Sequence, residues 1–132
     1  MKLSELGKIR VPKGALRVEI DTPEDRILLT PKGTIRGWFA TLDTEVPEDF
    51  YFEVGAVRLA HETTRREDVE GAMPDYSIVG FNIQYDIGCY LPYITDNRLT
   101  IQLLLPEFDP YRLRFTVKES VMAACVAKAS EL

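Results

Sequence analysis

Residues 79–87, Val-Gly-Phe-Asn-Ile-Gln-Tyr-Asp-Ile, alternate apolar and polar side chains without interruption. Side chains on a β-strand point to opposite faces in turn, so this period of two predicts a strand with one buried and one wet face. Further strands are predicted by similar alternation or by short apolar runs bounded by Pro and Gly. They cover residues 15–20, 26–30, 34–41, 50–54, 56–60, 98–105 and 111–117.

Half-buried strands favour antiparallel pairing, because the strands of parallel sheets are usually buried on both faces. About eight strands separated by turn signals predict an all-β fold, either an antiparallel β-sandwich or a barrel. The last segment differs, because Val121–Lys128 is rich in Ala and follows Ser120, a suitable N-cap. We therefore expect a short C-terminal helix after the strands.

Length and composition indicate a single domain over all 132 residues. The net charge of −5 argues against nucleic acid as the main partner, because an acidic domain repels phosphates unless its basic residues gather in one patch. Cys89 and Cys125 lack a CxxC spacing and are expected to be free thiols of a cytoplasmic protein. The first ten residues lack the apolar core of a secretory signal, and no apolar run approaches the roughly 18 residues that span a bilayer.

The sequence contains few candidate catalytic residues. His61 is the single histidine, so any Ser-His-Asp or Cys-His arrangement would have to use it. It follows a predicted strand beside Glu62, and we expect an ordinary surface histidine there. One histidine and two dispersed cysteines do not supply the usual zinc ligands. The sequence predicts a protein that is not an enzyme and holds no cofactor.

Four carboxylates gather between Glu67 and Asp75. They could bind calcium, but the EF-hand spacing is missing. The preferred interpretation is structural: Asp68 caps a helical turn that begins at Val69, and the other carboxylates are solvated. We expect no metal site.

Aromatic and basic residues are the candidates for binding. Trp38 lies on a predicted strand, and Tyr90 and Tyr93 lie in the long loop 88–97, where flat rings could stack on a sugar or a base. The alternative is that Trp38 belongs to the core and that the tyrosines brace the loop. Arginines also occupy the polar alternates of several strands, where they face solvent or a partner. They are Arg36, Arg58, Arg112 and Arg114.

Short motifs along the chain are similar to those of a known family. Ile-Arg-Gly-Trp at 35–38 is followed by Arg-Arg-Glu-Asp-Val at 65–69, by Pro74, and by Gly80-Phe81. The pattern resembles the small immunoglobulin-like β-sandwich domain found beside the catalytic domains of some bacterial glycosyltransferases and polysaccharide-assembly proteins. The resemblance spans residues 16–105. The chain departs from the pattern at Phe39, where a small residue is usual, and in the length of the loop 88–97.

The resemblance implies an immunoglobulin-like β-sandwich over residues 15–118, with a helical tail or linker at 119–132. It implies a non-catalytic accessory domain whose partners are a glycan or an adjoining catalytic domain. The residues expected to bind a ligand are Trp38, Arg65, Arg66, Asp68, Tyr90 and Tyr93. Two alternatives remain: a protein–protein interaction or oligomerisation module without sugar affinity, and a small hydrolase that uses His61, Glu67 and Asp68.

Overall fold

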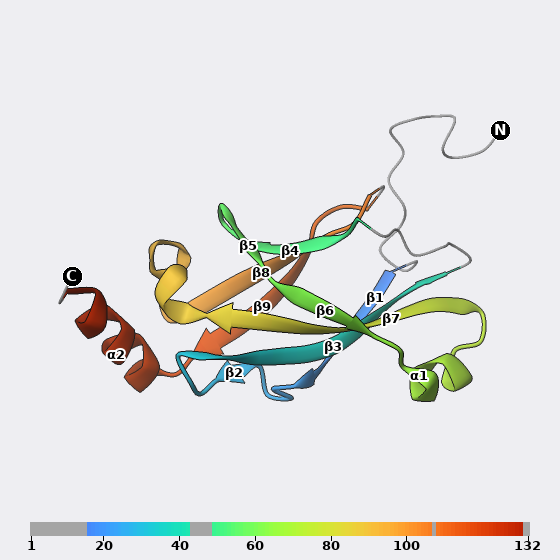
Figure 1. The fold of residues 1–132 in the computed structure, drawn as a ribbon, viewed down its shortest axis with the longest axis horizontal. Helices are drawn as coiled ribbons and strands as arrows, with labels where there is room; N and C mark the ends of the chain where they lie inside the picture. Colours follow the sequence, from blue (N-terminus) through green and yellow to red (C-terminus); the bar gives the residue numbers. More distant parts are fainter. Residues whose placement is uncertain (1–15, 43–48, 107, 131–132) are drawn as a thin grey trace.

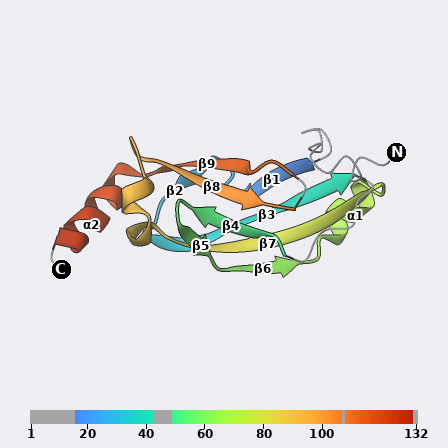
Figure 2. The ribbon, with the colours of Figure 1, turned by 90° about the horizontal axis from the view of Figure 1, so that it is seen from above.

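The structure, a computed structural model, describes residues 16–42, 49–106 and 108–130 and consists mainly of two β-sheets (Figures 1 and 2). The four-stranded sheet has the order β1 (Leu16–Thr22), β3 (Lys32–Leu42), β7 (Tyr76–Asp86), β6 (His61–Thr64). The five-stranded sheet has the order β2 (Ile27–Leu28), β9 (Tyr111–Val117), β8 (Arg98–Leu104), β4 (Tyr51–Val54), β5 (Val57–Leu59). The predicted start of the sandwich at Ala15 lies outside the described residues.

The core lies between the two sheets and follows the alternation in the sequence. On β7, Phe81, Ile83 and Tyr85 are buried, and β8 buries Leu99, Ile101 and Leu103 in the same way. The ring of Phe81 lies 4.9 Å, centroid to centroid, from that of Phe52 on β4, so this pair joins the two sheets. A fully buried ring of this size contributes about 1.5–3 kcal/mol relative to an exposed one. The predicted all-β fold is therefore confirmed at the level of two mostly antiparallel sheets.

Gly37, in the middle of β3, allows β1 to approach closely. A Cβ atom at this position would collide with the backbone carbonyl oxygen of Glu19 and would lie 2.9 Å from Cζ of Phe81. A glycine inside a strand often marks such an approach. Gly37 is thus a site of close contact between β1 and β3.

Two strands differ from the sequence prediction. β6 was not expected, because His-Glu-Thr-Thr has no apolar alternation; it forms at the edge of its sheet through backbone pairing with β7. β2 shrinks to two residues and pairs with β9 in parallel, the one parallel pairing among the described strands. Amide groups of Thr116 and Lys118 donate to the carbonyl oxygens of Arg26 and Leu28 at 2.8 and 3.0 Å.

Helices lie at the two ends of the sandwich (Figure 1). The short α1 (Glu67–Ala72) packs Val69 onto the outer face of the four-stranded sheet. At the other end, α2 (Glu119–Ser130) contacts the 3₁₀ turn η3 (Ile87–Cys89) and buries Val121 and Cys125 in the main core. None of the helices in the described ranges is long and apolar enough to cross a membrane.

The predicted N-cap of the C-terminal helix is wrong. Ser120 lies inside α2, which begins at Glu119. The amides of Val121 and Met122 donate to the carbonyl oxygen of Lys118, so the helix starts one residue after the end of β9. Lys118 alone separates the strand from the helix, and its amide still donates to the carbonyl oxygen of Leu28.

Candidate functional site

Trp38 is buried beneath α1. Only 7% of the residue is exposed, and it forms a second hydrophobic cluster with Ala40 and Val69. The guanidinium of Arg17 lies 5.4 Å from the centroid of its ring. Trp38 points away from the main core, as the alternation along β3 requires, but the helix covers this outward face. The ring therefore offers no open surface to a sugar.

Arg66 joins α1 to the four-stranded sheet. Its guanidinium donates two hydrogen bonds to Asp68, at 3.1 and 3.0 Å, and a further short one to Asp21 on β1. The hydrogen bonds from Arg66 lower the pKa of the Asp68 carboxyl, and the two carboxylates, Asp68 first, raise the pKa of Arg66. Two parallel bonds between a guanidinium and a carboxylate combine energy with fixed geometry. Arg66 therefore bridges Asp68 on α1 and Asp21 on β1.

The expected cap by Asp68 is wrong. Arg66 occupies the N-cap position, where its carbonyl oxygen accepts from the amides of Val69 and Glu70 at 3.1 and 2.9 Å, and no side chain caps the helix. Asp68 lies inside the first turn, where its carboxylate is held by Arg66. Arg65 is exposed and pairs with Glu70 at 3.2 Å. Arg65, Arg66 and Asp68 thus all take part in ion pairs around α1.

Tyr90 and Tyr93 lie at the opposite end of the molecule and differ in exposure. Tyr90 is 3% exposed, and its hydroxyl oxygen accepts a hydrogen bond from the Asp86 amide at 3.0 Å. Burial raises the pKa of Tyr90. It braces the loop, as the alternative reading of the sequence expected. Tyr93, which ends the 3₁₀ turn η4 (Leu91–Tyr93), is 44% exposed.

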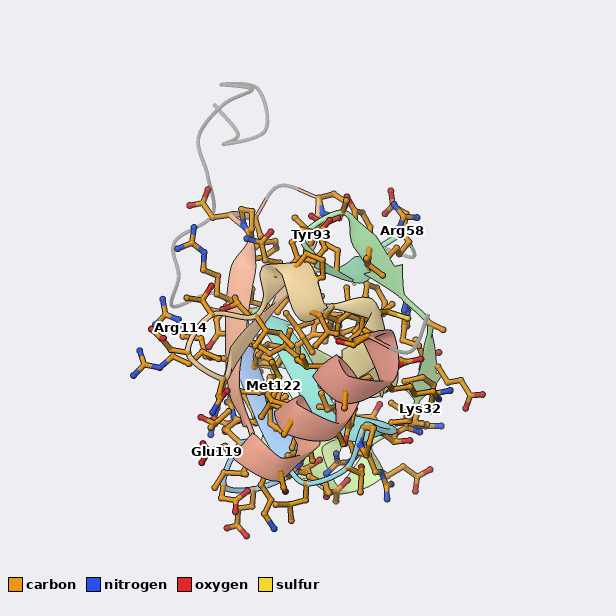
Figure 3. The ribbon with its side chains drawn as sticks, turned by 90° about the vertical axis from the view of Figure 1, so that its left-hand side faces the viewer. Lys32, Arg58, Tyr93, Arg114, Glu119 and Met122 are labelled. Atoms are coloured by element: carbon orange, nitrogen blue, oxygen red, sulfur yellow. The ribbon has the colours of Figure 1, made fainter. Side chains whose placement is uncertain are left out.

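The ring of Tyr93 stands directly over Gly55 in the turn between β4 and β5. A Cβ atom at Gly55 would run into the ring, and the backbone there has a φ of +52°. Both conditions favour glycine, which adopts positive φ without strain. The contact holds the exposed Tyr93 ring against the edge of the five-stranded sheet (Figure 3).

His61 does not meet the two carboxylates of the proposed hydrolase. Its ring packs against Phe50 and Phe52, with centroids 5.0 and 5.3 Å apart, and burial lowers its pKa. Those phenylalanines belong to the main core, whereas α1, which carries Glu67 and Asp68, covers the outer face of the same sheet. The described residues also contain no group of three or more side chains suited to hold a metal ion.

Three shallow pockets that share lining residues lie on the outer face of the five-stranded sheet, and together we call them the groove. β8 contributes Arg98, Thr100 and Gln102, and β9 contributes Arg112, Arg114 and Thr116. Strand register places Arg98 opposite Thr116, Thr100 opposite Arg114, and Gln102 opposite Arg112. Tyr93 and Gly55 border the groove beside Thr100 and Gln102.

Among the residues that line this groove, the sequence analysis had singled out Tyr93 as a ring that could stack on a ligand, and Arg112 and Arg114 as facing solvent or a partner. It missed Arg98, Thr100 and Gln102. The missed residues are the polar residues in the alternating pattern of β8. The sequence signal that could have found them is that they alternate in step with the polar residues of β9. Pairing residues 98–104 with 111–117 as a hairpin would have brought both sets to one face. Of the six predicted ligand residues, only Tyr93 borders the groove. Comparison of this chain with protein-family models, curated proteins and solved structures finds no match.

Proposed function

We propose that this chain is a non-catalytic accessory domain of a bacterial glycosyltransferase or polysaccharide-assembly protein, and that it binds carbohydrate in the groove of the five-stranded sheet. The observation that carries the proposal is the exposed ring of Tyr93 beside Thr100 and Gln102. A sugar presents an apolar face to an aromatic ring and hydroxyl groups to polar side chains. Hydroxyl and amide side chains both donate and accept hydrogen bonds, as sugar hydroxyls require.

The arrangement of strands supports an immunoglobulin-like identity for this module. With β1 labelled A, β3 to β9 follow as B, C, C′, D, E, F and G, and β2 is an additional strand beside G. The four-stranded sheet then has the order A-B-E-D, and the five-stranded sheet contains G-F-C-C′. Immunoglobulin domains divide their strands between two sheets in this way. Such sandwiches serve as recognition modules in many proteins, so the fold is compatible with the proposal.

The groove is also rigid enough to bind at low entropic cost. Thr100 and Gln102 lie on a central strand that is paired with β4 on one side and with β9 on the other. Tyr93 is held by Gly55 and by the backbone hydrogen bond from its amide to the carbonyl of Tyr90 at 2.8 Å. Groups fixed before binding lose little freedom when the ligand arrives.

The test is titration of the protein with bacterial polysaccharide fragments, followed by amide chemical shifts in NMR spectra. We expect shifts at Thr100, Gln102 and Arg114, and about tenfold weaker binding by Tyr93→Ala, a loss of about 1.4 kcal/mol. Gln102→Ala should weaken binding too. Gln84→Ala is the matched control, because Gln84 is exposed on the other sheet. Shifts around Trp38 and α1 alone would contradict the proposed site.

An interaction module remains the second candidate, because β6 is an open edge. Among the described strands it pairs only with β7, so its outer backbone groups could pair with another chain. Light scattering after size exclusion distinguishes the two. A dimer that strengthens with concentration and is abolished by Thr63→Pro would favour this second function over sugar binding.

A further inference from the structure

We propose that the groove recognises an acidic polysaccharide, one whose sugars carry carboxylates at intervals, and that Arg98, Arg112 and Arg114 bind those carboxylates. This inference rests on the proposed carbohydrate-binding function and adds the chemical class of the glycan. Arginine suits the task because its planar guanidinium binds a carboxylate through two parallel hydrogen bonds.

The three arginines form a row along the groove. Arg112 and Arg114 are two residues apart on β9, which separates their Cα atoms by about 7 Å at the rise of an antiparallel strand. Arg98, on β8, lies opposite Thr116 of β9, so it continues the row beyond Arg114. From Arg112 to Arg98 the row extends for about 14 Å along the strands. Figure 3 shows Arg114 projecting outward from the sheet.

No ion pair within the described residues involves these three side chains, and all three residues are exposed. Three other arginines are paired with carboxylates: Arg17 with Glu19, Arg65 with Glu70, and Arg66 with Asp21 and Asp68. Asp109 is the one carboxylate among the described residues that line the groove, and it lies at the end near Arg112. The described residues that line the groove therefore carry an excess of positive charge.

That excess is unusual in an acidic chain with a net charge of −5. Like charges on neighbouring strand positions repel one another, so a row of arginines that has no ion pair among the described residues disfavours the fold by a small amount. Bound carboxylates would remove the repulsion. Charge complementarity thus selects an anionic occupant for this face, while Thr100, Gln102 and Tyr93 supply the contacts to the sugar rings.

Charge and aromatic content favour an acidic glycan over a nucleic acid. The negative charge of the whole chain repels a dense polyanion. Single-stranded nucleic acids are usually held on several stacking rings, and among the described residues Tyr93 is the one exposed ring beside this groove.

The experiment compares charged and neutral forms of the same sugars by titration calorimetry. The probes are oligosaccharides of polygalacturonate, polymannuronate and hyaluronate, each with a counterpart whose carboxyl groups have been reduced to alcohols. We expect at least one acidic probe to bind at least tenfold more tightly than its neutral counterpart. Its affinity should decrease as salt is raised, because ions screen exposed charges.

Variants identify the residues responsible. The double variant Arg112→Gln/Arg114→Gln should bind the acidic probe at least tenfold more weakly, with a shallower dependence on salt. The matched control is Arg36→Gln, which alters an exposed arginine of the four-stranded sheet and should leave binding unchanged. Circular dichroism establishes that each variant is folded before titration.

Each outcome decides between the claims. Equal binding of charged and neutral probes, with no effect of the double variant, overturns the acidic-glycan inference and leaves the carbohydrate-binding function intact. Failure of every probe, charged and neutral, overturns both. Tighter binding of a single-stranded oligothymidine than of any glycan, lost in the double variant, overturns the inference in favour of a nucleic acid.

Discussion

Arginine takes two different roles in this molecule, and the neighbouring side chains decide between them. Arg66 is held by two carboxylates, and its Cγ lies where a Cβ atom at Gly80 would collide with it, 2.6 Å away. Arg114 lies on a sheet face with Thr100 across from it and no carboxylate bound to it within the described chain. The contacts of Arg66 leave its side chain no freedom to bind a ligand. The side chain of Arg114 keeps that freedom.

His61 gives a prediction about pH at the residue scale. Its folded pKa is lowered by burial against Phe50 and Phe52, so the unfolded chain binds a proton more readily. Stability is complete above the ordinary histidine pKa of about 6.5 and decreases as pH falls below that value toward the folded pKa. His61→Phe removes the titrating group and keeps a ring in place. We expect its urea midpoint to drop less than that of the wild type between about pH 7 and pH 5. Equal drops would show that the pKa of His61 is the same in the folded and the unfolded chain.

Residue orientation was predictable from the sequence where one face is buried. Alternation correctly assigned Phe81 and Ile83 to the core, because strand side chains change face at every step. It also placed Trp38 on the face opposite Phe39. It could not show that Trp38 is covered, since the cover is Val69, which comes about thirty residues later in the chain. Pattern rules describe the strand itself and carry no information on a helix that folds onto it.

At the scale of elements, α1 depends on its surroundings. Six residues are too few to form a stable helix alone, because nucleation costs more than so few hydrogen bonds return. Val69 anchors the helix on Trp38, and Arg66 ties its first turn to β1. The motif that suggested a ligand site in the sequence is therefore accounted for by the attachment of this helix.

Two glycines near α1 make a matched test of that attachment. Gly71 lies in the helix, has no positive φ, and would have nothing within 4 Å of an added Cβ atom. Gly71→Ala should raise the free energy of unfolding by about 0.5–1 kcal/mol, because alanine is the better helix former. Gly80→Ala should lower it, because the new methyl group would collide with Thr64 and Arg66. Urea denaturation of both variants measures the two signs. Stabilisation by both would show that Arg66 is not confined by Gly80.

The strands that sequence analysis missed or predicted with the wrong length were mispredicted for one physical reason. β6 has polar or exposed residues on both faces, so no hydrophobic alternation marks it, and only backbone pairing with β7 makes it a strand. β2 was expected to be longer, yet its pairing partner β9 meets it over two residues only. Strand edges are determined by the partner strand, whose position depends on the packing of the whole sandwich.

At the scale of the whole molecule, the distribution of charge matters more than its sum. The net charge of −5 predicted that polyanions would be repelled unless basic residues were gathered. The hairpin of β8 and β9 gathers Arg98 with Arg112 and Arg114, although Arg98 is more than ten residues away in sequence. Composition could not reveal this row, because it depends on strand register. The groove was therefore the part of the candidate site least accessible to sequence analysis.

The two ends of the sandwich should unfold together, although the C-terminal segment was expected to be a tail or linker. Val121 of α2 is 5% exposed and belongs to the main core, whereas Val126 on the same helix is 50% exposed. Val121→Ala removes two buried methyl groups and should lower the free energy of unfolding by about 1.5–3 kcal/mol. Val126→Ala, the matched control, should change it by less than about 0.5 kcal/mol.

The measurement uses the fluorescence of Trp38, the single tryptophan, which lies beneath α1 at the end of the molecule opposite α2 (Figure 1). If α2 is an integral part of the fold, loss of the Val121 contacts must shift the unfolding transition seen by this distant ring, because one cooperative unit has one stability. Helical circular dichroism should shift by the same amount. A change in the helical signal with an unchanged Trp38 transition would instead show that α2 opens locally, as an attached tail would.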